Sequence, residues 1–293
     1  MKQLDIRKLD EIKEQHWNYC SKRLNPANLD KQNKEQMQQF KRLCISNPFN
    51  FDNATNIVEE FLRGITIDVD LRSQYESFRK SQNSEWNGTK LIKELGVTVC
   101  PYCGMNYFST VSKSENGRTV SVATLDHYIP KESYPMLALN IYNLIPCCKN
   151  CNSTFKGTST AKIINPYFYS LENNLKFKVP IQNLKNFISD ENSKYEIEVE
   201  NRAKDKRVRT MVNEHIRVLS IKERYQYFET IAKSILKKKV YYNNTRISEL
   251  ESFEELKFKK GDIEKMLICQ DIFNENEPFL KFKNDIWNQF SEE

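Results

Sequence analysis

Hydrophobic and polar positions alternate with a helical period along the first third of the chain. Over residues 1–95 the apolar positions recur every three or four residues, as at Met37, Phe40 and Cys44. A later stripe of the same kind, around 91–95, ends at a glycine, the residue type that favours the left-handed end of a helix. This region is therefore predicted to be helical.

The pattern changes over residues 96–165. Two β-rich runs flank Asn116-Gly117, a strong signal for a tight hairpin turn, and we expect the return strand to lead into Asp126-His127. A loop, a second short strand and a helix follow, so the predicted order is strand, loop, strand, helix. These elements are expected at 108–112, 119–123, 143–146 and 149–156.

The remaining residues, 166–293, are predicted to combine a short hairpin with helices. Alternation of apolar and polar residues around 175–179 and 195–199 predicts two paired strands. Helical periods return at 208–219 and 221–235. The predicted fold class is therefore α+β, predominantly helical. Three domains are expected, a helical N-terminal region at 1–95, a small module at 96–165 and a C-terminal region at 166–293.

Composition narrows the class of protein only in part. The 293 residues are 39% hydrophobic and 29% charged, which fits a soluble globular protein. No run of about 18 apolar residues occurs and the first residues lack the apolar core of a signal peptide, so we expect cytoplasmic residence without a membrane span. The net charge of +6 permits an anionic partner. Basic residues concentrate over 202–239, which is either a solvated helix face or a track for phosphates.

Two C-x-x-C pairs carry the clearest chemical signal in the chain. Cys100 and Cys103 form the first pair and Cys148 and Cys151 the second, and together they can close one tetrahedral zinc site. Cys147 adjoins the second pair but has the wrong spacing to Cys151 for a knuckle. Four thiolates leave no open position on the metal, so this zinc is predicted to be structural. It would stabilise a module too small to fold on its hydrophobic core alone.

The residues between the two pairs are those that a metal-assisted phosphodiesterase requires. Asp126 and Asn152 offer oxygen ligands, which suit Mg²⁺ or Mn²⁺ better than softer metals. His127, with an unperturbed pKa of about 6.5, is suited to act as general base on water. Consecutive residues of a strand face opposite sides, so Asp126 and His127 can work together only at a distorted strand end or in a loop.

With these residues in this order, 97–160 resembles the HNH endonuclease family, also called ββα-metal or His-Me finger nucleases, in its zinc-stapled form. The resemblance implies a ββα-metal module embedded between helical flanks, in which His127 activates water and Asp126 and Asn152 hold the divalent metal. It also implies that Asn143 braces the loop through hydrogen bonds to backbone. Many members carry histidine where this chain has Asn152, and the asparagine favours Mg²⁺ or Mn²⁺.

The sequences of segments 126–135 and 142–152 resemble those of a narrower group within that family. These are HNH proteins of bacterial anti-phage defence systems, such as the Septu nuclease subunit and retron-associated effectors. Some of them act beside an ABC-type or SMC-like ATPase. The chain has no Walker A sequence, so the resemblance implies a separate ATPase subunit as partner.

The chain is thus interpreted as a metal-dependent HNH endonuclease that hydrolyses phosphodiester bonds in DNA and leaves a 5′ phosphate. Lys156, one helical turn after Asn152, is predicted to contact a phosphate of the nucleic acid, the alternative being a solvated lysine. Three alternatives stay open. One is an RNA-cleaving effector, since metal-assisted hydrolysis needs no 2′-hydroxyl. Another is a restriction-type enzyme with sequence-specific recognition, although no recognition helix stands out. The third is a zinc-stapled module that has lost catalysis and only binds nucleic acid or protein, against which the intact set of His127, Asp126, Asn143 and Asn152 argues.

Overall fold

The computed structural model of the protein describes residues 1–23, 29–49, 57–80, 86–112, 119–181, 195–253, 258–269 and 276–289. Helices dominate these residues, and their strands pair into three small two-stranded sheets. The fold is therefore α+β and mostly helical, which confirms the fold class predicted from the sequence.

Helices make up most of the described part of the N-terminal region, as predicted. They are α1 (Ile6–Arg23), α2 (Lys34–Ile45), α3 (Ile57–Leu62), α4 (Arg72–Lys80) and α5 (Gly88–Leu95). Asn33 caps α2 and Asn87 caps α5, each by accepting hydrogen bonds from backbone N–H groups of the first turn. Gly96 ends α5 at a φ of 63°, a left-handed conformation that glycine adopts without steric cost. The chain then runs directly into the first cysteine pair.

The central module holds two antiparallel pairs of strands. In the first, β1 (Thr110–Ser112) pairs with β2 (Thr119–Ser121), as predicted, and the expected Asn116-Gly117 turn lies outside the described residues. In the second, β3 (Thr124–His127) pairs with β4 (Leu144–Cys147). The return strand of the first hairpin leads into Asp126-His127, as expected, but it ends at Ser121, and these two residues belong to a separate strand. The N–H of Ala123 turns back to the Ser121 hydroxyl (3.1 Å), and a new strand with a different partner begins at Thr124.

The rest of the central module follows the predicted order of strand, loop, strand and helix. Two short 3₁₀ turns, η1 (Pro135–Leu137) and η2 (Ile141–Asn143), lie in the loop between β3 and β4. The closing helix, η3 (Asn150–Lys156), is π-helical. Its widened turn ends where the N–H of Gly157 donates to the carbonyl of Asn152 (2.8 Å).

The C-terminal region opens with the predicted pair of strands. β5 (Leu175–Lys178) and β6 (Glu198–Asn201) are antiparallel, with Phe177 opposite Val199. The helices are α7 (Lys206–Val218), α8 (Ile221–Gln226), α9 (Glu229–Tyr241), α10 (Asn244–Glu251), α11 (Lys260–Ile268) and α12 (Leu280–Asn288). The single helix expected over 221–235 is wrong, because the chain breaks between α8 and α9, where Phe228 turns in to pack on Phe279 at 4.5 Å between ring centres.

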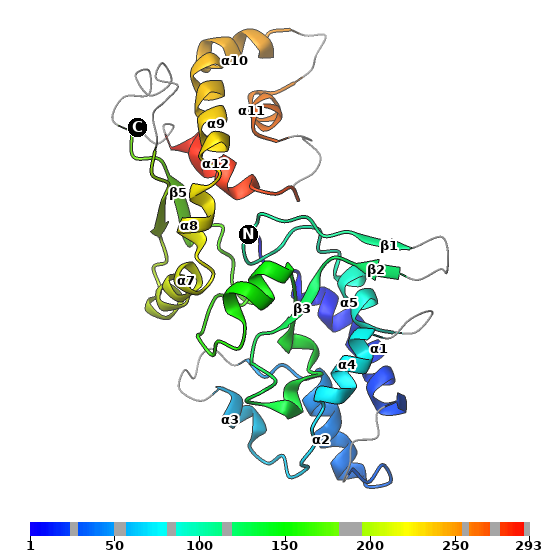
Figure 1. The fold of residues 1–293 in the computed structure, drawn as a ribbon. Coiled ribbons are helices and arrows are strands. Elements are labelled where there is room, and N and C mark those ends of the chain that lie inside the picture. The colour runs from blue at the N-terminus through cyan, green and yellow to red at the C-terminus, as the bar shows by residue number, and fades with distance from the viewer. Residues whose placement is uncertain are drawn as a thin grey trace.

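The central module joins the two ends of the molecule. Figure 1 shows α9 to α12 gathered at one end and α2 and α3 at the other, with β3 between them. The C-terminal region is fixed to the first cysteine pair by hydrogen bonds to three successive backbone carbonyls. The donors are the His215 ring, the Tyr225 hydroxyl and the Phe279 N–H, and the acceptors are Tyr102 (2.8 Å), Cys103 (2.7 Å) and Gly104 (2.7 Å).

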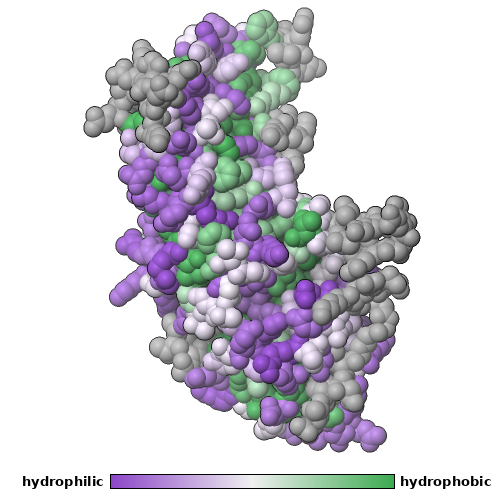
Figure 2. All heavy atoms as spheres, in the orientation of Figure 1, coloured by the Kyte–Doolittle hydropathy of each residue, from purple (hydrophilic) through white to green (hydrophobic). Residues whose placement is uncertain are grey.

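Hydrophilic residues cover much of the face shown in Figure 2, with hydrophobic residues in scattered patches among them. Among the described residues, no helix combines the length and the apolar character that crossing a bilayer demands.

Candidate active site and metal centre

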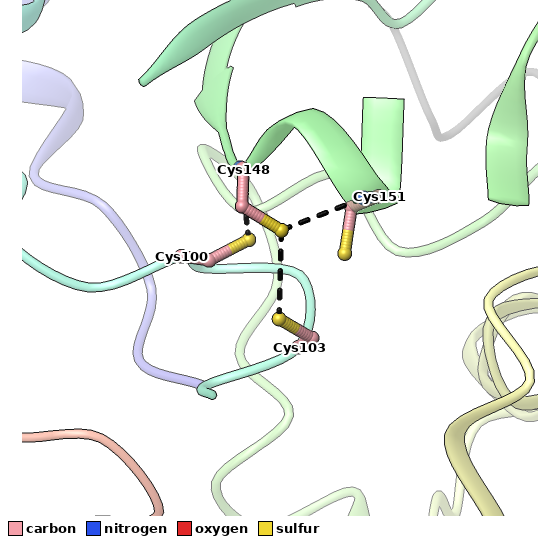
Figure 3. A group of neighbouring side chains, drawn as sticks. All are labelled: Cys100, Cys103, Cys148 and Cys151. Carbon is pink, nitrogen blue, oxygen red and sulfur yellow. Dashed lines mark hydrogen bonds between the residues drawn. The ribbon is translucent and has the colours of Figure 1, made fainter. Parts of the chain in front are cut away.

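The four cysteines of the two C-x-x-C pairs converge on one point. Cys100 and Cys103 come from the loop after α5, and Cys148 and Cys151 from the end of β4 and the start of η3 (Figure 3). Their sulfurs all lie within 4.8 Å of one another, and those of Cys103 and Cys148 are 3.9 Å apart. A tetrahedral zinc ion bonded to four sulfurs at about 2.3 Å holds them roughly 3.8 Å apart. The cluster therefore fits zinc.

The surroundings of the sulfurs also suit a metal-thiolate centre. Four thiolates around a divalent ion leave a net negative charge, which donors in the surrounding shell must offset. The Asn106 side-chain amide donates to the Cys148 sulfur (3.3 Å), and the Arg224 guanidinium of α8 donates to the Cys151 sulfur (3.4 Å). The backbone N–H groups of Cys148 and Cys151 each donate to a cluster sulfur as well, at 3.4 Å. Cys147, which the sequence analysis excluded from the zinc site because of its spacing to Cys151, lies on β4 and outside the cluster.

The pairing of β3 with β4 brings Asp126 and His127 into a cleft. Asp126 lies opposite Ile145 and His127 opposite Leu144, so the two side chains belong to a buried ladder. His127 is the last residue of β3, which is the strand-end placement that the sequence argument required. The cleft has a volume of about 660 Å³, and both residues line it together with Asn152.

His127 is held in one orientation and one tautomer. Its Nε2 lies 2.9 Å from the carbonyl oxygen of Ala138, which can only accept, so Nε2 carries the hydrogen and Nδ1 has a free lone pair. The ring packs edge-on against Tyr75 of α4, at 4.3 Å between ring centres. Burial lowers the pKa of His127 to about 4, against a smaller opposing effect of the Ala138 hydrogen bond. The ring is therefore neutral at neutral pH and able to accept a proton.

Asn143 lies in the loop between β3 and β4, and its side chain forms hydrogen bonds to backbone groups of that loop, as the resemblance implied. Its side-chain oxygen accepts from the N–H of Ile129 (2.7 Å), and its amide nitrogen donates to the carbonyls of Ile129 (3.0 Å) and Leu137 (3.2 Å). The side chain is fully buried. It ties the exit of β3 to η1, just ahead of the Ala138 carbonyl that orients His127.

Asp126 is buried with both carboxylate oxygens engaged. Oδ1 accepts from the ammonium of Lys156 (3.0 Å), and Oδ2 accepts from the hydroxyl of Tyr102 (2.8 Å). Burial raises the pKa of Asp126, while the charge of Lys156 and the two hydrogen bonds act in the opposite direction. A carboxylate has about four lone-pair positions, so each oxygen retains one for a further ligand.

The placement of Lys156 corrects the sequence prediction. The side chain is only 1% exposed, so it is not a solvated lysine, and its ammonium donates to the carbonyl of His127 (2.7 Å) as well as to Asp126. An ammonium held inward in this way is not presented to a phosphate in this structure. Lys156 instead clamps the two residues that end β3.

Asn152 faces the cleft from η3. Its amide nitrogen donates to the Thr124 hydroxyl (3.1 Å) and to the carbonyl of Leu125 (3.3 Å). Since a carbonyl only accepts, this fixes which end of the amide is nitrogen and leaves the oxygen available to a ligand. Asp126 and Asn152 thus present hard oxygen donors to one cleft, the donor set that Mg²⁺ or Mn²⁺ prefers.

The opposite wall of the cleft comes from α4 and the loop after β3. Glu76 pairs there with Arg79 (2.8 Å) and Lys131 (3.1 Å), and Lys149 adds an exposed cation at the edge. Glu132 lines the cleft as well, so cations and carboxylates are mixed around the oxygen donors of Asp126 and Asn152.

Sequence reasoning missed Tyr102 and Arg224. Tyr102 occupies the middle of the first cysteine pair, and nothing in the chain marks it as the partner of Asp126, 24 residues later. Arg224 belongs to a long basic run in which only the fold distinguishes it from its neighbours. Contacts of this range arise from tertiary packing and leave no periodic signal.

Comparison with known proteins agrees with this geometry. Residues 100–156 match the family model described as HNH endonuclease. The chain is also similar to the Septu protein PtuB of Bacillus thuringiensis, with 34% identity over 108 residues, a match that covers 34% of this chain and 38% of that protein. The chain therefore matches about two fifths of the length of that relative. No solved structure matches the chain.

Proposed function

We propose, from the premise that residues 100–156 form an HNH endonuclease domain, that this protein is a metal-dependent endonuclease that hydrolyses phosphodiester bonds in DNA. The observation that carries the proposal is the state of His127. Its Nε2 is tied to a backbone carbonyl while Nδ1 is free to accept, in a cleft that it shares with Asp126 and Asn152.

In the proposed reaction, His127 acts as general base. Neutral at working pH, it accepts a proton at Nδ1 from the attacking water, and the Nε2–H bond to Ala138 holds the ring in place as the positive charge develops. Tyr75 packs against the ring and limits its rotation. Asn143 serves this residue indirectly, because it fixes the loop that supplies the Ala138 carbonyl.

Asp126 and Asn152 are proposed to hold the catalytic Mg²⁺ or Mn²⁺. A divalent ion bound there supplies charge neutralisation at the scissile phosphate and at the departing oxygen. Tyr102 and Lys156 are positioning residues in this scheme, because each donates a hydrogen bond to one oxygen of the Asp126 carboxylate. The four cysteines are proposed to hold a structural zinc that keeps Tyr102 in place.

A role in anti-phage defence is proposed because the chain is similar in sequence to a Septu protein and because its motif segments resemble those of defence nucleases. On this proposal a helical N-terminal region (1–95) and a C-terminal region with a short hairpin and helices (166–293) flank the nuclease module (96–165), and a separate ATPase subunit is the partner. The second candidate function is an RNA-cleaving effector, since metal-assisted hydrolysis of a phosphodiester needs no 2′-hydroxyl.

The test is nicking of supercoiled plasmid by the purified protein with Mg²⁺ or Mn²⁺, with a matched RNA substrate beside it. The key variant is His127→Ala, and the control is His16→Gln, which alters another buried histidine with a backbone-carbonyl partner (2.8 Å) outside the cleft. Loss of a general base typically costs about 10²–10⁴-fold in rate. We expect that loss in His127→Ala alone, with zinc content unchanged in both variants.

Two results would contradict the proposal. Equal cleavage by wild type and His127→Ala would point to a contaminant and remove His127 from the mechanism. Absence of cleavage of either nucleic acid, with zinc bound and with the neighbouring operon product added, would favour the silent binding module. Phage plating on cells that express wild type or His127→Ala tests the defence role separately, and equal plating on both would refute it.

A further inference from the structure

The basic run over 202–239 divides into two parts with different surroundings. In the first part, four cations face carboxylates or the cysteine cluster. Arg202 pairs with Glu200, Arg217 with Glu214 and Lys222 with Glu196, while Arg224 donates to the Cys151 sulfur. These four have partners within the protein, in line with the solvated helix face with structural pairing considered from the sequence.

The second part gathers cations around a cleft. This cleft, of about 550 Å³, lies along α9 and the start of α10 and shares no lining residue with the catalytic cleft. The described residues that line it include four cations, two tyrosines and no carboxylate. They are Thr230, Lys233, Ser234, Lys237, Lys238, Tyr241, Tyr242 and Arg246.

The lining residues form one face rather than a chance cluster. Positions 230, 233–234, 237–238 and 241 recur at helical spacing, so they make a stripe about 17 Å long on α9 at about 1.5 Å per residue. Lys238 is fixed by a hydrogen bond to the Leu267 carbonyl (2.8 Å), and Arg246 by one to the Tyr241 carbonyl (3.0 Å).

Helix stabilisation alone does not account for this arrangement. Cations in the last turn of a helix offset its dipole, and Lys238 does so in α9. Lys233 lies in the second turn of α9, where its ammonium is 5.6 Å from the centre of the Tyr195 ring, and Arg246 lies on α10; the dipole of α9 accounts for neither position. Tyr241 is 58% exposed and Tyr242 37%, so neither ring is committed to the core.

The cleft leads toward the nuclease domain. An adjoining hollow of about 500 Å³ shares Thr230, Ser234 and Lys238 with it. That hollow reaches Tyr107, which is 53% exposed and lies between the first cysteine pair and β1. The two hollows thus adjoin along α9, with exposed tyrosines in each, and the second also contains Glu277, which is paired with Lys283 (2.6 Å).

We propose that the cleft lined by α9 and α10 is a second nucleic-acid site, which binds the phosphodiester backbone outside the catalytic cleft. Clustered Lys and Arg attract successive phosphates, and none of the described residues that line this cleft is a carboxylate. Exposed tyrosines offer surfaces on which bases stack. A small phosphorylated ligand would need fewer cations, and an acidic polypeptide would gain nothing from stacking. The inference rests on the proposed function, since the nucleic acid bound at this second site is the proposed substrate of the same enzyme.

The test measures binding by the full chain in a His127→Ala background, so that the nucleic acid stays intact. Fluorescence anisotropy of a labelled oligonucleotide, single-stranded and duplex, is followed over a range of salt concentrations. The test variant is Lys237→Gln with Arg246→Gln. The matched control, Lys31→Gln with Lys34→Gln, removes two exposed cations near the start of α2 and so makes the same change in net charge.

We expect the test variant to bind several-fold more weakly and the control to bind as wild type does. The slope of log Kd against log salt should fall by roughly 0.7–0.9 for each phosphate contact removed. Tyr241→Ala should weaken single-strand binding, and Tyr241→Phe should preserve it, because the ring and not the hydroxyl stacks.

Unchanged affinity and salt slope in the test variant would overturn the inference, as would equal losses in the control. Competition by poly-glutamate as strong as that by the oligonucleotide, with no effect of Tyr241→Ala, would overturn it in favour of an acidic protein partner. The binding and cleavage assays distinguish failure of this inference from failure of the proposed nuclease function. If wild type cuts DNA while the test variant binds normally, only this site is refuted; if the site binds but wild type never cuts, only the nuclease proposal is refuted.

Discussion

The thiol cluster and the proposed catalytic cleft are built from the same stretch of chain, yet they are opposite kinds of site. The cluster is closed, since its four sulfurs face one another and receive hydrogen bonds from Asn106, Arg224 and their own backbone. The cleft is open on one side, and at its base Asp126 and Asn152 retain positions for further ligands. A closed set of ligands stabilises structure, and an open set permits chemistry.

Tyr102 connects the two sites. Its backbone lies between the zinc-binding positions Cys100 and Cys103, and its hydroxyl donates to the Asp126 carboxylate. On the far side, its carbonyl accepts from His215 of α7. The closed site thus helps to position the open one, so damage to either should have different and separable consequences.

The largest effect is expected from breaking the cluster. Cys151→Ser removes one of the four sulfurs, and structural zinc contributes on the order of 10–16 kcal/mol in small domains. We expect loss of zinc, unfolding of the central module and loss of cleavage together, measured by metal analysis, near-UV circular dichroism and plasmid nicking. Cys147→Ala is the control, because that thiol is buried next to the cluster but is not part of it. Zinc loss in the control would contradict the assignment.

Breaking the buried ion pair should come next in size. Lys156→Met leaves the Asp126 carboxylate buried without its cation, which typically destabilises a protein by about 3–5 kcal/mol. Denaturant unfolding in the presence of zinc measures this. Adding Asp126→Asn to Lys156→Met should recover part of the stability, since no unpaired charge then remains. Equal stability of Lys156→Met and the exposed-site control Lys149→Met would rule out the clamp.

Removing one hydroxyl tests the link between the sites more finely. Tyr102→Phe leaves Oδ2 of Asp126 without its donor, at a cost of about 1–3 kcal/mol. Zinc content should not change, while the Mg²⁺ concentration for half-maximal cleavage should rise, because a less firmly held carboxylate binds the ion more weakly. An unchanged metal requirement would show that Tyr102 matters only for folding.

These experiments also separate what the sequence could predict from what it could not. The spacing of Cys100, Cys103, Cys148 and Cys151 determines the cluster locally, because each pair forms one tight turn around a metal. The order of β3, loop, β4 and η3 was likewise predictable from alternation and helical period.

The environment of the cleft residues was not predictable in this way. Lys156 was expected at the surface and is buried, because its position on η3 faces β3 and not solvent. The carbonyl that orients His127 belongs to Ala138, whose side chain carries no signal. Partners of this kind are determined by how distant segments pack, so the residue type at a single position does not predict them.

The smallest expected effect concerns His215, which contacts Tyr102 from the C-terminal region, and the pH dependence of the protein's stability. His215 donates from Nε2 to the carbonyl of Tyr102, and its Nδ1 is buried without a hydrogen-bond partner among the described residues. Burial lowers the pKa of His215 to about 4, against about 6.5 in an unfolded chain. Between these values the unfolded chain binds a proton that the folded protein does not, so stability falls as the pH decreases from about 6.5 to about 4. Above that window the contribution is complete.

We therefore expect the free energy of unfolding of wild type, relative to His215→Gln, to decrease by up to about 1.4 kcal/mol for each pH unit within the window. His127 has a similarly lowered pKa, but it is present in both proteins and its contribution cancels. Denaturant titrations between about pH 7 and pH 5, with zinc content checked at each pH, measure the difference. A difference that does not change with pH would mean that His215 titrates normally and does not hold the knuckle as a neutral donor.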